Sequence, residues 1–140
     1  MIRKLACLIV MGFMLAPVAA LAQNSSKEKA ATAAAEKWLG LVDRGEYAAS
    51  WKDAASFFRS RVTEQKWAQM SKEVRAPLGK LESRKLAQAA YRTSLPGAPD
   101  GQYVVMQFDT SFAKKKSAVE TVTTVLDKDG KWRVVGYFIR

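Results

Sequence analysis

The chain has 140 residues, and its 23 Lys and Arg against 13 Asp and Glu give it a net charge of +10 at pH 7. It contains no histidine, and its single cysteine, Cys7, lies in an N-terminal segment that we predict to be removed. The remaining chain therefore excludes His-based catalytic triads, thiolate nucleophiles and the usual zinc, haem and iron–sulfur ligand sets. We expect no metal and no cofactor, and we assign no catalytic residue.

Residues 1–22 have the layout of a secretory signal. A short positive region precedes an uncharged apolar run over residues 5–15, and Ala20 and Ala22 supply small side chains at positions −3 and −1 of a cleavage site. An uncleaved membrane anchor is the alternative, but Pro17 argues against a stable membrane-spanning helix. We predict cleavage after Ala22 and a location in the periplasm or outside the cell.

The part of the chain after this site is long enough for one domain with its own core. We expect a polar leader over residues 23–29 and a single domain over residues 30–140. Ser25 and Glu28 fit a capping box, in which the two side chains satisfy free backbone N–H groups at the start of a helix. Apolar residues then recur at helical spacing until Gly45, which suits the end of that helix.

Two further helices are predicted before the middle of the chain. Apolar and aromatic residues repeat at helical spacing from Tyr47 to Phe58, which predicts a second helix. Thr63 has the side chain and the position of the N-cap of a third helix. Pro77 ends that helix, because proline has no amide hydrogen and disfavours the α conformation at Ala76.

The apolar spacing changes to every second residue in the second half of the chain. Residues 103–112 alternate in this way, and residues 119–126 are rich in β-branched side chains. An Asp-Gly pair at 129–130 connects the latter run to residues 132–139, which is the strongest hairpin signal in the sequence. These three segments are predicted to be strands.

Residues 80–94 fit either a short helix or a fourth strand. We prefer the strand, because a three-stranded sheet would cover three helices poorly. The order of helices first and strands second indicates an α+β fold. We therefore predict three N-terminal helices packed on a curved four-stranded antiparallel sheet.

A series of short motifs, rich in Trp, Gly and Pro, runs through the chain in this order: Trp38-Leu39, Gly45-x-Tyr47-x-x-Ser50-Trp51, Arg75-x-Pro77-Leu78-Gly79, Leu95-Pro96-Gly97-x-Pro99-Asp100-Gly101-x-Tyr103, Glu120-Thr121-Val122-Thr123 and Asp129-Gly130-x-Trp132-x-Val134-x-Gly136-Tyr137. Together they resemble the bacterial family catalogued as domain of unknown function 4019, from about Ala30 to the end of the chain. The resemblance implies an exported or envelope protein with a cystatin-like or nuclear-transport-factor-like cone. It implies no catalytic residue.

Glu120 is the candidate site residue with the clearest physical signal. It shares a predicted strand face with Val122 and Leu126, so an inward face would bury its carboxylate, which then needs a cationic partner. Arg75 and Arg84 are the candidate partners. Two interpretations stay open: a structural ion pair between helix and sheet, which we favour, and the polar floor of a pocket for a ligand carboxylate, amine or sugar hydroxyl.

Two tyrosines complete the candidate ligand-binding set. Tryptophans and phenylalanines at helical spacing are usually core residues, and we assign most of the aromatic side chains to the core. Cone-shaped α+β folds often leave an open mouth between helices and sheet, and we expect Tyr103 and Tyr137 to reach such a cavity.

Three functions are consistent with these features. The leading hypothesis is a non-enzymatic binding or accessory domain of the bacterial envelope, whose partner is a protein or a small ligand. The second is an enzyme with a carboxylate or tyrosine acid/base, which rests on fold analogy alone. The third is attraction of Lys114, Lys115 and Lys116 to an anionic membrane or glycan. Nucleic acid is not an expected partner of an exported protein.

Overall fold

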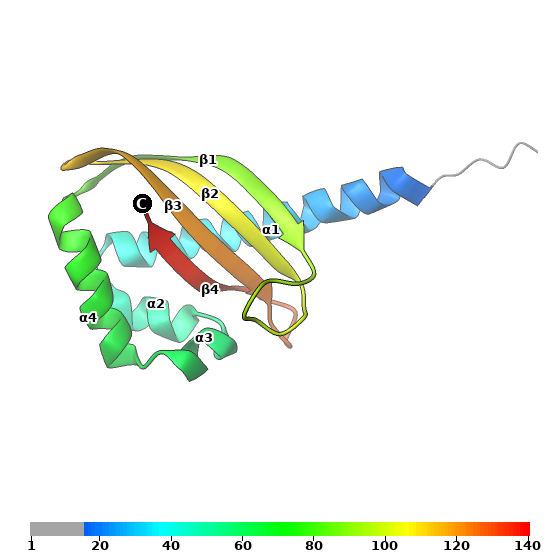
Figure 1. Ribbon diagram of the computed structural model, residues 1–140, viewed down its shortest axis with the longest axis horizontal. Helices are drawn as coiled ribbons and strands as arrows, with labels where there is room; N and C mark the ends of the chain where they lie inside the picture. The colour runs from blue at the N-terminus through cyan, green and yellow to red at the C-terminus, as the bar shows by residue number, and fades with distance from the viewer. Residues whose placement is uncertain (1–15) are drawn as a thin grey trace, which may run out of the picture.

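A computed structural model of the chain describes residues 16–140, so most of the predicted signal segment lies outside the described residues. The described chain is an α+β fold in which helices precede strands (Figure 1). Its helices and strands are α1 (Ala16–Asp43), α2 (Tyr47–Asp53), α3 (Ser56–Arg61), α4 (Glu64–Arg75), a 3-10 turn (Ala76–Leu78), β1 (Leu81–Arg92), β2 (Tyr103–Phe112), β3 (Lys115–Leu126) and β4 (Trp132–Ile139).

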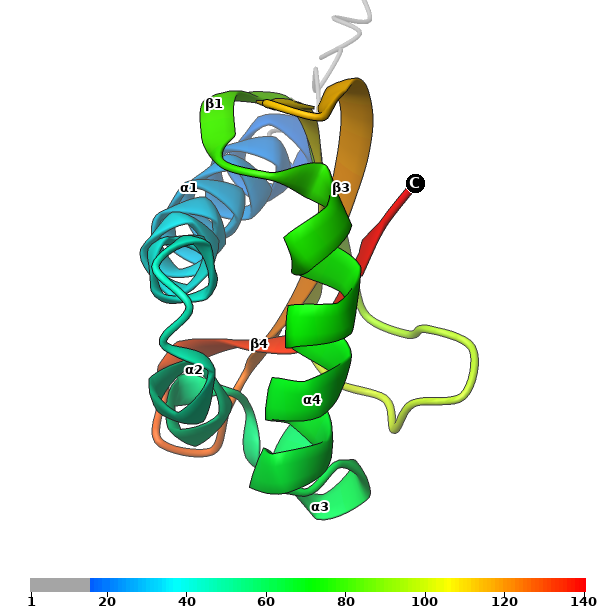
Figure 2. The ribbon, with the colours of Figure 1, turned by 90° about the vertical axis from the view of Figure 1, so that its left-hand side faces the viewer.

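The four strands form one antiparallel sheet in the order β1-β2-β3-β4. Each strand therefore pairs with the next one along the chain, and β1 and β4 form the two edges. The ambiguous segment at 80–94 is a strand, as we preferred, and the predicted fold class is confirmed. The long helix α1 crosses the sheet and contacts all four strands, while α4 packs mainly on α2 (Figures 1 and 2).

The predicted second helix is wrong in one respect, because two helices occupy its place. Ala54 and Ala55 have extended backbones between α2 and α3. Both alanines are fully buried, and the amide nitrogen of Ala55 donates to the carbonyl oxygen of Val134 at 2.8 Å. The edge strand β4 thus takes the hydrogen bond that a continuous helix would need, so residues 16–140 form four α-helices where three were predicted.

The predicted start of the first helix is also wrong. The helix runs through the expected capping box at Ser25, and residues 23–29 are part of α1 instead of a separate leader. Their amide groups already lie inside the helix, so no capping box is needed there. The carboxylate of Glu28 instead accepts a hydrogen bond from the backbone nitrogen of Tyr91 at 3.1 Å, which ties α1 to β1.

The predicted ends of α4 are confirmed. The hydroxyl oxygen of Thr63 accepts from the amide of Lys66 at 3.2 Å, as an N-cap does. The α-helix ends at Arg75, two residues before Pro77, and Gly79 then turns the chain into the sheet with a φ of 74°. A Cβ at this glycine would lie only 3.2 Å from that of Ala113, so both its backbone angle and its surroundings favour glycine.

The core lies between α1 and the inner face of the sheet. Trp38 is its largest fully buried side chain, and its ring lies 5.7 Å from that of Trp67, centre to centre. Ser50 satisfies both indole N–H groups: its carbonyl oxygen accepts from Trp38 at 2.8 Å, and its hydroxyl accepts from Trp67 at 2.9 Å. Ser50 therefore supplies the acceptors for both tryptophans of the core. Within residues 16–140, none of the helices has the length and apolar character that a bilayer span needs.

Candidate ligand-binding site

Glu120 is fully buried, as its strand face predicted. Its Oε1 accepts from Nε of Arg84 at 2.7 Å and from the hydroxyl of Thr110 at 2.6 Å. Its Oε2 accepts from Nη2 of Arg84 at 3.2 Å and from the hydroxyl of Tyr137. Each carboxylate oxygen thus has two donors, which is what a charged group needs in order to remain in a protein interior.

Asp43 shares Arg84 with Glu120, although no sequence pattern indicated that it would. Arg84 donates from Nη1 to Oδ2 of Asp43 at 2.7 Å and from Nη2 to Oδ1 at 2.9 Å. Burial alone would raise the pKa of Asp43, but hydrogen bonds from Arg84 and Arg75 outweigh it and lower that pKa. Asp43 is the last residue of α1, where a carboxylate commonly faces solvent, so its sequence position carries no sign of burial.

Arg75 belongs to the same cluster but does not hydrogen-bond to Glu120. Its Nη2 donates to Oδ1 of Asp43 at 2.8 Å, and its guanidinium carbon lies 4.9 Å from the centre of the Phe112 ring. Of the two candidate partners for Glu120, only Arg84 makes direct contact. Asp43 therefore links Arg75 to the other charges at the point where α1, α4 and β1 meet.

This cluster of Asp43, Arg75, Arg84 and Glu120 has two positive and two negative charges. It joins the ends of α1 and α4 to strands β1 and β3, so its geometry is that of the structural ion pair we favoured. Tyr137 of β4 adds a hydroxyl to the cluster, which donates to Glu120. Burial and the neighbouring Glu120 both raise the pKa of this tyrosine, so it is a neutral hydrogen-bond donor at physiological pH.

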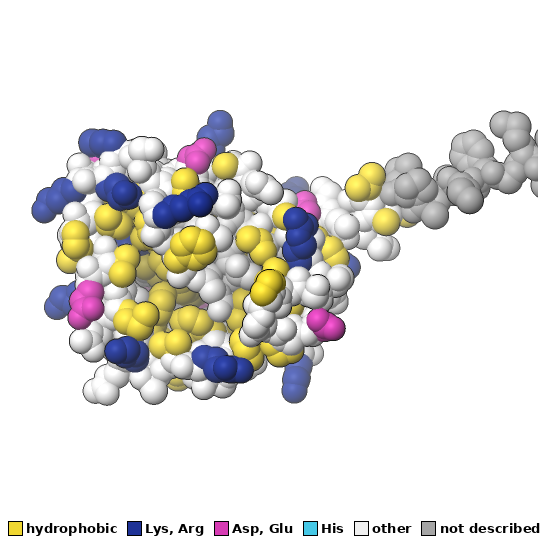
Figure 3. All heavy atoms as spheres, in the orientation of Figure 1, with side chains coloured by type: hydrophobic (Ala, Val, Ile, Leu, Met, Phe, Trp, Pro, Cys, Tyr) yellow, Lys and Arg dark blue, Asp and Glu magenta, His cyan; other side chains and the backbone are white. Residues whose placement is uncertain are grey.

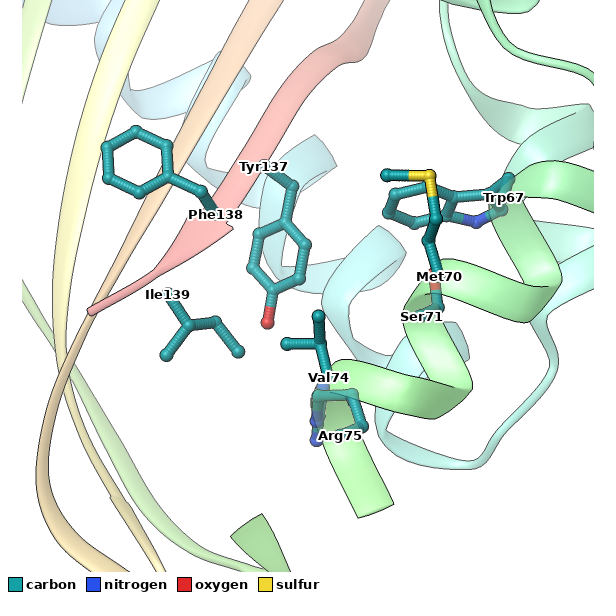
Figure 4. Close-up of a pocket in the computed structure, with 8 residues that line it drawn as sticks. All are labelled: Trp67, Met70, Ser71, Val74, Arg75, Tyr137, Phe138 and Ile139. Carbon is teal, nitrogen blue, oxygen red and sulfur yellow. The ribbon is translucent and has the colours of Figure 1, made fainter. Parts of the chain in front are cut away.

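A cavity of about 240 Å³ lies beside this cluster, between α4 and β4. Figure 4 shows the hydroxyl of Tyr137 pointing toward the end of α4 that carries Val74 and Arg75. The lining residues come from these two elements only: Trp67, Met70, Ser71, Val74, Arg75, Tyr137, Phe138 and Ile139. Of the candidate site residues, Arg75 and Tyr137 line this cavity, whereas Arg84 and Glu120 lie behind them and do not.

The walls of this cavity are apolar and open to solvent. Met70 is 44% exposed, Val74 is 51% exposed and Phe138 is 56% exposed. Figure 3 shows apolar side chains gathered in the hollow between α4 and the sheet, with Lys and Arg around it. The hollow forms because α4 packs mainly on α2 and the 3-10 turn, which leaves its other face free.

Residues 34–137 match the family model described as a protein of unknown function, DUF4019. The chain belongs to this family. The match covers the whole buried charge cluster and every cavity residue except Phe138 and Ile139. No curated protein matches the chain in sequence. The family description names no activity.

The other candidate residues of the DUF4019 domain lie away from this cavity. Tyr103 is buried on the opposite face of β2 from Val104, and its hydroxyl donates to the carbonyl oxygen of Pro99 in the loop before the strand. Lys114, Lys115 and Lys116 are exposed at the turn between β2 and β3. The structure therefore brings Arg75, Arg84, Glu120 and Tyr137 together, and it separates Tyr103 and the lysines from them.

The apolar half of the site was not predicted from the sequence either. Met70 and Val74 recur at helical spacing with Trp67, which predicts a buried face, but both are exposed on α4, whereas Ser71 between them is buried. Phe138 follows the outward alternation of β4. The apolar character of Met70, Val74 and Phe138 was the signal for this half of the site. Single apolar residues are common on protein surfaces, so the sequence alone does not show that these three gather around one cavity.

Proposed function

We propose that this protein is a non-enzymatic binding domain of the bacterial envelope, which takes a small ligand in the cavity between α4 and β4. The observation that carries the proposal is the gathering of three large exposed apolar side chains, Met70, Val74 and Phe138, around one hollow. Such side chains are normal on a surface when scattered, but a group of them around a concave site is typical of ligand and partner surfaces.

The chemistry beside the cavity supports binding over catalysis. Each carboxylate of the charge cluster is held by an arginine at 2.7–2.9 Å, so neither Asp43 nor Glu120 is available as a general base. The raised pKa of Tyr137 keeps that hydroxyl protonated, with its hydrogen directed to Glu120. A general acid or base needs a pKa near the working pH. The polar groups at this cavity are hydrogen-bond donors, the guanidinium of Arg75 and the hydroxyl of Tyr137, and they suit binding.

A fluorescence experiment tests the proposed cavity. N-phenyl-1-naphthylamine is neutral and becomes fluorescent in apolar surroundings, so the protein should enhance its emission. Val74→Trp adds bulk to the cavity wall and should abolish most of that enhancement. Gln65→Trp places the same side chain at an exposed position of the same helix and should have no effect. Equal enhancement by both variants would show that the probe binds elsewhere and would remove the proposal.

The location in the envelope rests on residues 1–22 and on the family resemblance, and it needs its own test. Expression of the full chain in a Gram-negative host should yield a periplasmic form that begins at Gln23. The intact mass of the recovered protein measures this directly. Recovery of the uncut chain from the cytosol would contradict the proposed location.

Association with an anionic surface remains a second candidate, favoured by one observation. The amide of Ala113 donates to the carbonyl oxygen of Lys80 at 2.8 Å, so Lys80 lies beside Lys114 at the β2–β3 turn, and both are exposed. Retention on phosphatidylglycerol vesicles that falls with added salt would support it. Lys114→Glu should then release the protein, and retention that ignores both salt and this substitution would exclude the candidate.

A further inference from the structure

Resting on the proposed function, we infer that the ligand is a small amphiphilic carboxylate. Its carboxylate accepts hydrogen bonds from the guanidinium of Arg75 and the hydroxyl of Ser71, and its apolar part lies over Met70, Val74 and Phe138. The structure contains a set of buried donors at this point that the protein itself leaves unused.

Arg75 has more donors than the protein has acceptors for it. The residue is only 8% exposed, and its Nη2 donates to Asp43. Within residues 16–140, neither Nε nor Nη1 has a hydrogen-bond partner. Buried polar groups are nearly always paired, and an arginine left partly unpaired is the kind of group that an incoming acceptor stabilises. Phe112 and Asp43 hold the guanidinium in place, so its orientation is set before any ligand arrives.

Ser71 provides the second unused donor. It precedes Arg75 by four residues, so the two side chains share one face of α4. It is 6% exposed, and its Oγ also has no partner within the described chain. A serine inside a helix usually donates to the carbonyl of the preceding turn, and no such bond is present here. Both residues line the cavity.

The charge balance favours an anion over a neutral or cationic group. Glu120 has all its donors from Arg84, Thr110 and Tyr137, and Asp43 shares its own Oδ1 between two arginines. Arg75 is therefore the positive charge of the cluster with the least direct compensation. Arg75 also lines an adjoining hollow that carries three further cations, Arg44, Lys72 and Lys80, against the single carboxylate of Asp43. Against this background an ammonium group would be repelled.

The lining and the volume of the cavity favour a carboxylate over other anions. A carboxylate has one negative charge and two acceptor oxygens, which suits one arginine and one hydroxyl. A phosphate monoester has nearly two charges and three strong acceptor oxygens, while the rest of this wall is apolar. The volume of 240 Å³ is that of about eight water molecules in the liquid. That space suits a short acyl or aromatic carboxylate and is too small to enclose a two-chain lipid.

Three ligands with eight carbon atoms each test the inference: octanoate, octanol and octylammonium. Calorimetric titration of the protein recovered after expression of the full chain should show octanoate binding about tenfold more tightly than octanol, and octylammonium weakest. Ser71→Ala should weaken octanoate about tenfold and leave octanol unchanged. Arg75→Gln should abolish the preference for octanoate. Ser60→Ala removes a hydroxyl on α3 that donates to Phe57, and it should change neither affinity.

Because Arg75 also supports the fold, a second measurement on the unaltered protein accompanies the variants. The Nε–H resonance of a buried arginine is visible in a ¹H–¹⁵N spectrum, and octanoate should shift the Arg75 signal while octanol should not. Equal affinity for octanoate and octanol, with no shift of the Arg75 resonance and no effect of Ser71→Ala, would overturn the inference that the ligand is a carboxylate. It would leave the proposed binding function intact. Failure of all three ligands and of the neutral fluorescent probe would overturn the binding function itself.

Discussion

Arg84 of β1 holds Glu120 of β3 although β2 lies between the two strands. Nε of Arg84 is 2.7 Å from Oε1 of Glu120, and Thr110, which pairs with Arg84 in the ladder, donates to that same oxygen. The arginine therefore extends over the middle strand on the inner face of the sheet. In doing so it ties three strands together and, through Asp43, attaches the end of α1 to them.

Glu120→Gln should be among the most destabilising single-atom changes in the chain. Removing one partner of a buried ion pair costs about 3–5 kcal/mol, and we expect about 3 kcal/mol here because Arg84 keeps its bonds to Asp43. Urea unfolding followed by tryptophan fluorescence measures the change. Glu82→Gln breaks an exposed pair with Lys116 and should cost less than about 0.5 kcal/mol. Similar losses in the two variants would mean that Glu120 is not a buried charge.

Asp43 should make the domain sensitive to acid. Burial opposes ionisation of this carboxyl, but its arginine partners lower its pKa below the ordinary 3.8. As pH falls, the unfolded chain therefore takes up this proton before the folded chain does. The stability that Asp43 contributes is complete above about pH 4 and is lost as pH falls toward the folded pKa.

Asp43→Asn should therefore flatten the acid limb of a plot of unfolding free energy against pH between 6 and 2. The variant should also be less stable at neutral pH, because Arg75 loses its charged partner Asp43. Glu46→Gln, at an exposed position paired with Arg44, is the matched control and should leave the acid limb unchanged. An acid limb in Asp43→Asn as steep as that of the unaltered protein would contradict the assignment.

Tyr137 should have the opposite dependence on pH. Burial, and then Glu120, raise its pKa above the ordinary 10.0, so its stabilising effect is complete below pH 10 and is lost as pH rises toward the folded value. Tyr137→Phe should cost about 2 kcal/mol at pH 8, the usual effect of a hydrogen bond to a charged group, and less at pH 11. Unfolding free energies at the two pH values measure this. A constant difference would show that the hydroxyl is free to ionise.

Ser50→Ala should weaken the tryptophan core by about 2 kcal/mol. The hydroxyl of Ser50 is the acceptor for the indole N–H of Trp67 at 2.9 Å, and a buried donor left without an acceptor costs about 1–3 kcal/mol. The carbonyl that accepts from Trp38 is retained. Thermal unfolding with Ser60→Ala as the exposed control measures the effect. No change in melting temperature would mean that the Trp67 N–H finds another acceptor.

Local patterns were reliable where one short stretch of chain controls the conformation. Thr63 caps α4, Asp129-Gly130 turns β3 into β4, and the alternation around Glu120 placed it on an inner face. Each of these features depends on backbone geometry or side-chain spacing within about ten residues. The break at Ala54 and Ala55 was missed because it depends on a hydrogen bond to Val134, far along the chain.

The sequence by itself determined the order of helices and strands, the absence of histidine, and the need of Glu120 for a positive partner. Only the tertiary structure decided which arginine meets that need, because Arg75 and Arg84 carry the same charge and differ in where their helix and strand place them. It also decided that Asp43, Ser71 and Phe138 matter, since packing of α4 against α2 leaves its other face open toward β4. The spacing of residues along a chain shows which of them share one face of a helix or strand. A cavity forms only where two such faces lie opposite each other in the folded protein.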